Sequence, residues 1–222
     1  MKAIAMGLVM LLGSVTSLLA QYTTEANSPV RAGQKIYLEF DFSSVIKINH
    51  WDQQEAKAVL SVEEKEDWPT PEFTISVDNT TSAVSIYMKK QQFEDYWKKQ
   101  RGGRENCYCS TPTMTVEVWL PKGVDIGVKS ISADIETTFD GGELSLETIS
   151  GDVDIKLPAS QNISLKASTI SGDIYSDLTF EYLDGGKGLK EMVGVKLDAK
   201  LNNGGKNLQL KSISGDILLR RL

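Results

Sequence analysis

Acidic and hydroxyl side chains recur in this chain within a five-residue unit, Ile-Ser-Gly-Asp followed by Ile or Val. The unit occupies 149–153, 170–174 and 213–217, and a near copy, Ile-Ser-Ala-Asp-Ile, occupies 131–135. The serines of successive copies are 18, 21 and 43 positions apart, and 43 is close to two periods. Recurrence at a near-fixed interval indicates one supersecondary unit stacked on itself, here in rungs of about 20 residues.

If the rungs stack in register, Asp134, Asp152 and Asp173 form a column of carboxylates. Like charges about 5 Å apart repel by roughly 1 kcal/mol in water and by several kcal/mol at a protein surface. Hydrogen bonds from turn N–H groups or serine hydroxyls could offset this repulsion, and so could a bound Ca²⁺ ion. The denser Gly/Asp pattern of calcium-binding repeats is absent. We therefore expect hydrogen-bonded turns and no cofactor, with Ca²⁺ as the alternative.

The repeated unit itself is expected to be a corner between two strands. Alternation would turn its outer Ile and Val inward, with Gly at the same parity, and would turn Ser and Asp outward. A Gly that leaves no side chain for the core indicates close approach of neighbouring backbones. The predicted turn residues are Ser150, Gly151, Asp152, Ser171, Gly172, Asp173, Ser214, Gly215 and Asp216.

No catalytic residue is expected. His50 is the single histidine, and the acidic residues outside the repeat lie in charged runs typical of a solvated surface. Nucleophile-elbow, phosphate-loop and dinucleotide motifs are absent. Enzymes built on β-helices need carboxylates, often with Arg, Lys or His, that converge in a groove. The sequence therefore predicts a non-enzymatic protein, with a carbohydrate-active enzyme as the alternative.

The two cysteines, Cys107 and Cys109, are separated by one residue. Residues i and i+2 of a strand lie about 6.5–7 Å apart, which is near the limit for a disulfide. A strained local disulfide, a Cys-x-Cys metal site and two thiols without chemistry are the alternatives. The distance of His50 in the sequence disfavours the metal site, and the plain thiols are favoured.

The first 20 residues have the pattern of a secretory signal peptide. Lys2 precedes an apolar stretch at 4–12, and small and apolar residues lead to Gln21. The stretch is too short and too interrupted for a membrane anchor, and no later segment is apolar enough to span a bilayer. We expect export to the periplasm, the cell surface or the medium. The formal net charge of −6 argues against nucleic acid as a partner.

Short alternating strands are expected to position these residues. In 35–42 the apolar side chains occupy every second position, which is typical of a half-buried strand. A charged insert at 89–106 interrupts the strands, and a short helix there would place Phe93, Tyr96 and Trp97 on one face. Packing of these rings against the strands is the favoured interpretation, and a contact surface for sugar or protein is the alternative.

Aliphatic alternation with short strands in each rung predicts an all-β chain built as a parallel β-helix. Neighbouring coils would lie about 4.8 Å apart, and only neighbours would touch. We expect a single β-solenoid domain at 21–222. An N-terminal β segment at 21–113 would cap it or form degenerate rungs, with the cap favoured, and 114–222 would form the Ser-Gly-Asp rungs. The arginines at 220 and 221 would discourage pairing at the final edge.

The order of these parts resembles a bacterial adhesin-like family of unknown function, the DUF4097 type. The resemblance rests on VIKINHWDQQEAKAVLSVEEK, on TVEVWLPKGVDIGVKSISADI and on the serial Ile-Ser-Gly-Asp units, and it covers nearly all of 35–222. It implies a right-handed parallel β-helix with an N-terminal β segment and a location in the cell envelope. It implies no catalytic residues, and a fold alone does not establish a function.

The sequence thus predicts an exported, non-enzymatic protein that binds protein or glycan through a face of its solenoid. Self-association through the ends of the solenoid is a further alternative. Because the repeated unit is interpreted as a turn, the binding surface is expected on non-repeating residues, first of all Phe93, Tyr96 and Trp97.

Overall fold

The computed structural model describes residues 21–63, 68–69, 71–102, 111–183 and 194–222. The predicted signal peptide at 1–20 and the two cysteines lie outside these residues. Within the described ranges, no helix is long and apolar enough to cross a membrane.

The described residues form two β-sheets and one short helix, so the all-β prediction is confirmed. The eight-stranded sheet has the order β1 (Gln21–Pro29), β4 (Glu55–Glu63), β7 (Met114–Pro121), β3 (Val45–Trp51), β9 (Asp134–Thr138), β11 (Val153–Leu157), β17 (Ile217–Arg221) and β13 (Ile174–Ser176). The nine-stranded sheet has the order β14 (Glu181–Tyr182), β15 (Val195–Leu201), β12 (Ile163–Thr169), β16 (Lys206–Lys211), β10 (Leu144–Glu147), β8 (Ile126–Lys129), β2 (Lys35–Glu39), β6 (Ala83–Tyr87) and β5 (Ser76–Asn79).

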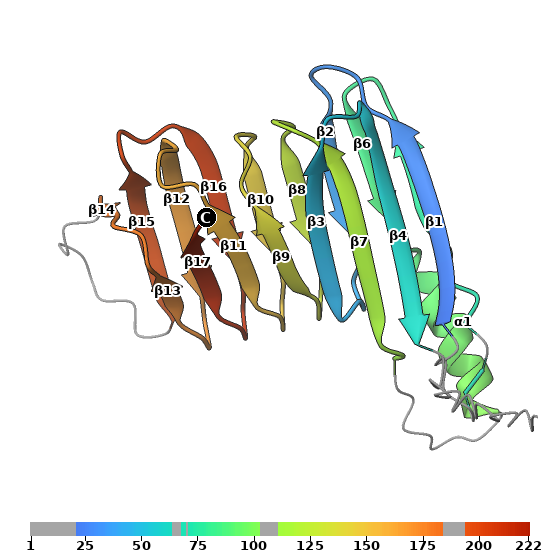
Figure 1. The fold of residues 1–222 in the computed structure, drawn as a ribbon. Coiled ribbons are helices and arrows are strands. Elements are labelled where there is room, and N and C mark those ends of the chain that lie inside the picture. The colour runs from blue at the N-terminus through green and yellow to red at the C-terminus, as the bar shows by residue number, and fades with distance from the viewer. Residues whose placement is uncertain (1–20, 64–67, 70, 103–110, 184–193) are drawn as a thin grey trace, which may run out of the picture.

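Each repeated unit carries the chain from the nine-stranded sheet to the eight-stranded sheet, as in β8 to β9 and β10 to β11. The strands of successive units pair in parallel and in register, so identical positions meet. In one such row Ile126, Leu144, Leu208 and Leu165 lie side by side. Buried side chains of both sheets belong to one hydrophobic cluster. Figure 1 shows the result as an elongated stack of strands.

The units do not stack in the order of the sequence, contrary to the expectation above. β16 lies between β10 and β12, and β17 lies between β11 and β13. The last unit of the chain is therefore inserted between two earlier ones (Figure 1). The arginines at 220 and 221 lie at the end of this internal strand, so their predicted protection of a terminal edge is wrong.

The sheets are mixed rather than purely parallel. β2 and β3 pair in parallel with β8 and β9, so part of the N-terminal segment continues the stack as a further coil. Antiparallel pairs occur toward the two ends, where β1, β4 and β5 lie at one end and β14 and β15 at the other. Antiparallel strands can be joined by a short turn, whereas parallel strands need a long crossover connection. Antiparallel strands are therefore a simple way to cover the last parallel strand at each end of the stack.

The charged insert forms α1 (Lys90–Arg101), which ends at Gly102 in the left-handed conformation, φ 53°. Phe93 and Tyr96 are buried, and the ring of Phe93 lies 4.7 Å from that of Phe42 and 4.9 Å from that of Phe73. The favoured packing interpretation is thus the one observed. Trp97 is half-buried, and its ring lies 5.2 Å from that of Phe42, so the apolar face of α1 covers one end of the core.

The inserted unit predicts an unusual response to truncation. Removing the terminal repeat of a sequential solenoid costs one interface and leaves the remainder folded. Here a chain that ends at Asn203 loses β16 and β17, which separates β10 from β12 and β11 from β13. We expect the truncated chain to lose its cooperative thermal transition in circular dichroism.

A peptide of residues 204–222 added in trans should restore that transition, whereas a scrambled peptide should not. A truncated chain that still unfolds cooperatively on its own would contradict the inserted arrangement.

Candidate functional site

The motif carboxylates form a column along one corner of the stack, in the order Asp134, Asp152, Asp216 and Asp173. Oδ1 of each of the first three accepts the backbone N–H of the next aspartate, at 2.9, 2.7 and 2.8 Å. Asp216 therefore lies between Asp152 and Asp173, which the sequence order did not predict. Among the described residues, no group of three His, Cys, Asp or Glu side chains is arranged to hold a metal ion.

The motif glycines lie where neighbouring backbones touch. A Cβ atom on Gly215 would lie 2.1 Å from the carbonyl oxygen of Gly151, and one on Gly172 would lie 2.2 Å from that of Gly215. Gly151 meets the carbonyl of Ala133 in the same way, at 2.0 Å. These contacts exclude any side chain at the three glycines. Ala133 begins the column, where the preceding coil carries no motif.

The first isoleucine of the motif does not point inward as expected. Ile149 is 43% exposed and Ile170 is 50% exposed. The corner turns the chain between Ile and Gly, so the alternation that holds within a strand does not continue through it. The last residue of the motif enters the core in three copies, at Ile135, Val153 and Ile217, and Ile174 of the remaining copy is half-buried.

A second ladder at this corner was missed from the sequence. The residue before each motif is Ser130, Thr148, Thr169 or Ser212, and all four are buried. Thr148 donates to the carbonyl of Ala133 at 3.1 Å, and Ser212 donates to that of Gly151 at 3.0 Å. Thr169 donates to the carbonyl of Gly215 at 2.8 Å. The signal was present, because all four copies have Ser or Thr before Ile.

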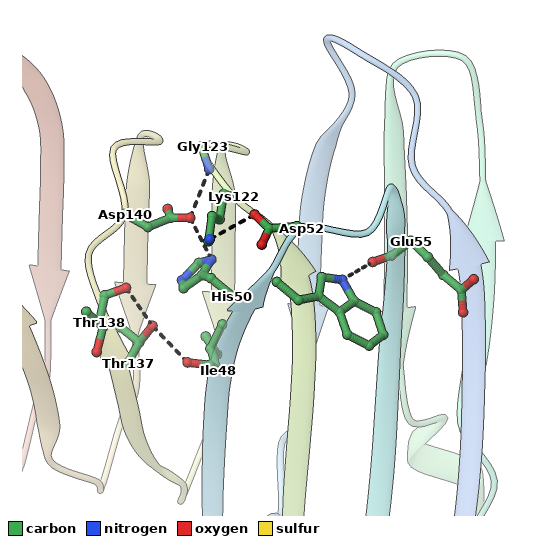
Figure 2. Close-up of polar contacts among 10 residues, drawn as sticks. Ile48, His50, Asp52, Glu55, Lys122, Gly123, Thr137, Thr138 and Asp140 are labelled. Atoms are coloured by element: carbon green, nitrogen blue, oxygen red, sulfur yellow. Dashed lines mark hydrogen bonds and ion pairs between the residues drawn. The ribbon is translucent and has the colours of Figure 1, made fainter.

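His50 lies at the end of β3, beside the loop between β9 and β10 (Figure 2). Its Nδ1 is 3.0 Å from Oδ2 of Asp140, and both side chains are largely buried. The backbone N–H of Gly123 also donates to Oδ2 of Asp140, at 2.9 Å. Nearby, the exposed Lys122 donates to Asp52 at 2.8 Å.

Burial alone would raise the pKa of Asp140. Its contacts with His50 and with the backbone N–H groups of Gly123 and Gly142 outweigh that effect and hold its pKa below the ordinary carboxyl value. The cavity beside this pair has a volume of only about 10 Å³, the space of a single water molecule. The His50–Asp140 pair therefore joins the end of β3 to the loop between β9 and β10.

A groove of about 380 Å³ lies on the outer face of the nine-stranded sheet. It crosses β2, β8, β10, β16, β12 and β15. Its central floor is one row of outward-facing residues that are paired across neighbouring strands, namely Tyr37, Gly127, Ser145, Gln209, Lys166 and Asp198.

Tyr37 forms one end of this row, and its ring leans over Gly127. A Cβ atom on Gly127 would lie 2.9 Å from Cδ1 of Tyr37, so any larger residue would push the ring aside. Unlike the motif glycines, Gly127 has no backbone atom of another strand within contact distance of that position. The lack of a side chain at Gly127 therefore leaves room for the ring of Tyr37. Tyr37 is 49% exposed.

The charged side chains of one rim are paired with neighbours across strands. Nζ of Lys35 lies 3.7 Å from Asp125, and Asn207 donates to Glu143 at 2.9 Å. At the far end, Lys166 and Asp198 are directly opposite each other on β12 and β15. The groove thus presents polar side chains, one glycine and one aromatic ring, with charges of both signs around it.

Residues 117–220 match the family model described as Toastrack DUF4097. This part of the chain, slightly less than half of it, is similar to the DUF4097 family. The resemblance is confirmed here over a shorter segment than 35–222, since the match begins within β7. No curated protein matches the chain.

The DUF4097 segment lies in a chain that is also similar to solved structures. One, described as a "putative cell adhesion protein" from Clostridium sporogenes ATCC 15579, is 12% identical with a TM-score of 0.50, covering 90% of this chain and 100% of that chain. Another, a "putative adhesin" from Bacteroides fragilis NCTC 9343, is 9% identical with a TM-score of 0.23, covering 92% and 99%. The first similarity supports the fold alone, and the second carries no argument.

The hydroxyl ladder of the DUF4097 segment yields a matched pair of variants. Ser212→Ala leaves the buried carbonyl of Gly151 without its hydroxyl donor, so we expect the free energy of unfolding to fall by about 1–3 kcal/mol. Ser214→Ala makes the same change at an exposed position two residues away and should alter stability by less than about 0.5 kcal/mol. Equal losses in urea denaturation would refute the ladder's contribution.

Asp140 predicts a pH dependence of stability. A carboxyl whose pKa is lowered in the folded state stabilises the fold above its unfolded pKa, about 3.9, and this stabilisation is lost as pH falls through the folded pKa. Asp140→Asn should therefore lower the free energy of unfolding at pH 7 by about 1.5–3 kcal/mol. The difference from wild type should shrink below about pH 4.

The control is Asp52→Asn, which changes the exposed partner of Lys122 close to the same junction. An exposed ion pair of this kind contributes little to stability, so this variant should follow the wild-type curve. A constant gap between Asp140→Asn and wild type from pH 7 to pH 3 would rule out the titration of Asp140 as its source.

Proposed function

We propose that this protein is exported to the bacterial cell envelope or surface and works there as a non-enzymatic binding protein. Its ligand, a protein or a glycan, lies in the groove on the outer face of the nine-stranded sheet. The observation that carries the proposal is this groove. At the other candidate positions, the motif aspartates and the His50–Asp140 pair, the polar side chains contact other groups of the protein.

Export is supported by the pattern of residues 1–20, and a location in the envelope by the match of residues 117–220 to the DUF4097 family model. The first solved structure described above carries a cell-adhesion description of its own, which is consistent with a binding role here. We infer further that residues 21–222 form one domain, since one hydrophobic cluster contains residues from both ends of the stack. Right-handed coils of about 20 residues are inferred from the family resemblance and from the 18-residue offset between β8 and β10.

The rival functions have less support. The small cavity at His50 and Asp140 leaves no room for a substrate, which weakens the carbohydrate-active alternative. Self-association would use the ends of the stack, and at one end the strands are short, with three residues in β13 and two in β14. Short edge strands are a common protection against edge-to-edge pairing.

The proposed function is tested by filling the groove. Ser145 is exposed at the centre of the row, and tryptophan is well tolerated in strands. We expect the Ser145→Trp variant of the exported protein to bind bacterial envelope fractions at least tenfold more weakly than wild type. Ser61→Trp, placed in β4 of the other sheet, should bind like wild type. Binding is measured by co-sedimentation with fluorescently labelled protein.

Equal binding by the two tryptophan variants would place the ligand elsewhere and refute the groove. A wild-type protein that binds no envelope fraction, no glycan and no surface protein above background would refute the binding function itself. Circular dichroism of each variant confirms that the fold is retained.

A further inference from the structure

We propose that the groove binds an unbranched, uncharged glycan chain, with one sugar ring stacked on Tyr37. This inference rests on the proposed function and names the class of its ligand. It follows from the ring, from the hydrogen-bonding groups of the central row, from the paired charges and from the position of the groove within the sheet.

The ring of Tyr37 is placed as a platform. It is half exposed, it leans over Gly127, and it forms the end wall of the groove. The face of an aromatic ring carries partial negative charge and the C–H groups of a sugar carry partial positive charge, so the two attract when stacked. A tyrosine held down in the interior of a polar sheet face offers such a stacking surface.

The central row suits hydroxyl groups. Ser145 and Gln209 each present a donor and an acceptor, and both are exposed in the floor of the groove. A sugar hydroxyl also donates and accepts, so each of these side chains can bond to it in either direction. A ligand that only donates or only accepts hydrogen bonds would leave the acceptors or the donors of these side chains without a partner.

The charges around the groove argue against a charged polymer. Lys35 faces Asp125, and Lys166 faces Asp198, so a cation and an anion lie side by side at each end of the groove. Glu143 is held by Asn207 on the same rim. A polyanion would meet the carboxylates and a polycation would meet the lysines, with repulsion in each case. An uncharged chain meets neither penalty.

The position of the groove disfavours an extended peptide. Peptides that bind to sheets pair their backbone with an exposed strand edge. Here β8, β10, β16 and β12 are internal strands, and their backbone groups are already paired on both sides. A glycan needs no backbone partner. Six strands at about 4.8 Å spacing span roughly 24 Å, which accommodates several sugar rings.

Direct binding to soluble glycans tests the inference. The exported protein is titrated calorimetrically with neutral oligosaccharides of two to six hexose or N-acetylhexosamine units, and with uronic-acid and sulfated oligomers of equal length. We expect binding of at least one neutral series, with affinity that rises with chain length. The charged oligomers should bind at least tenfold more weakly.

The variants separate the ring from the rest of the groove. Tyr37→Ala should lower the affinity for the neutral oligosaccharide by about tenfold, which corresponds to 1.4 kcal/mol. Tyr37→Phe keeps the ring and should stay within about threefold of wild type. Equal affinity of wild type and Tyr37→Ala, or no binding of any neutral oligosaccharide, would overturn the inference.

Failure of this inference can be told apart from failure of the proposed function. Suppose that envelope binding is abolished by Ser145→Trp but is unaffected by Tyr37→Ala and by excess neutral oligosaccharide, and is destroyed when the envelope is treated with protease. The groove would then bind a protein. The glycan assignment would be wrong while the binding function stands.

Discussion

A backbone contact too close for any side chain organises the central stack. The carbonyl oxygens of Ala133, Gly151 and Gly215 each lie about 2 Å from where the next coil would place a Cβ atom. Close contact brings the coils within reach of two further ladders, one of buried hydroxyls and one of carboxylates. Both ladders connect consecutive coils through the same few residues. The motif is therefore a unit of stacking, whose Gly and Asp make these contacts together with the Ser or Thr that precedes it.

The same constraint explains the long interval before the last copy. After β13, residues 177–183 and 194–204 lie outside the parallel stack and include β14 and β15 at one end of the nine-stranded sheet, and β16 then lies back in its middle. The final copy then fits between the second and third because it presents the same contacts on both sides. Asp216 accepts from Asp173 and donates its own N–H to Asp152. An inserted coil needs both neighbours, so the centre of the stack is completed only after the last residues are available.

The sequence predicted the strands, the repeated corner and the close backbone approach, because each leaves a local pattern. Alternation marks 35–42 and the segments after 114, and Gly at one parity marks the corner. The order in which the four copies stack could not be predicted from the sequence, because similar copies can stack in several orders with equal local fit. Exposure of Ile149 and Ile170 was also missed, because strand parity does not carry through a corner. His50 and Asp140 are 90 positions apart, and only the stacking of coils brings them together.

The groove could not be found from spacing for a related reason. Its central row takes one residue from each of six strands, and the neighbours in space are scattered between 37 and 209 in the sequence. Inward residues are fixed by the core and corner residues by stacking, which leaves the outward residues of the strands free to differ. Among these outward residues, Gly127 indicates a specific local arrangement. A glycine inside a strand weakens it, and here no backbone of another strand requires one. The missing side chain leaves room for the ring of Tyr37, which leans over Gly127, is half exposed and is not part of the core.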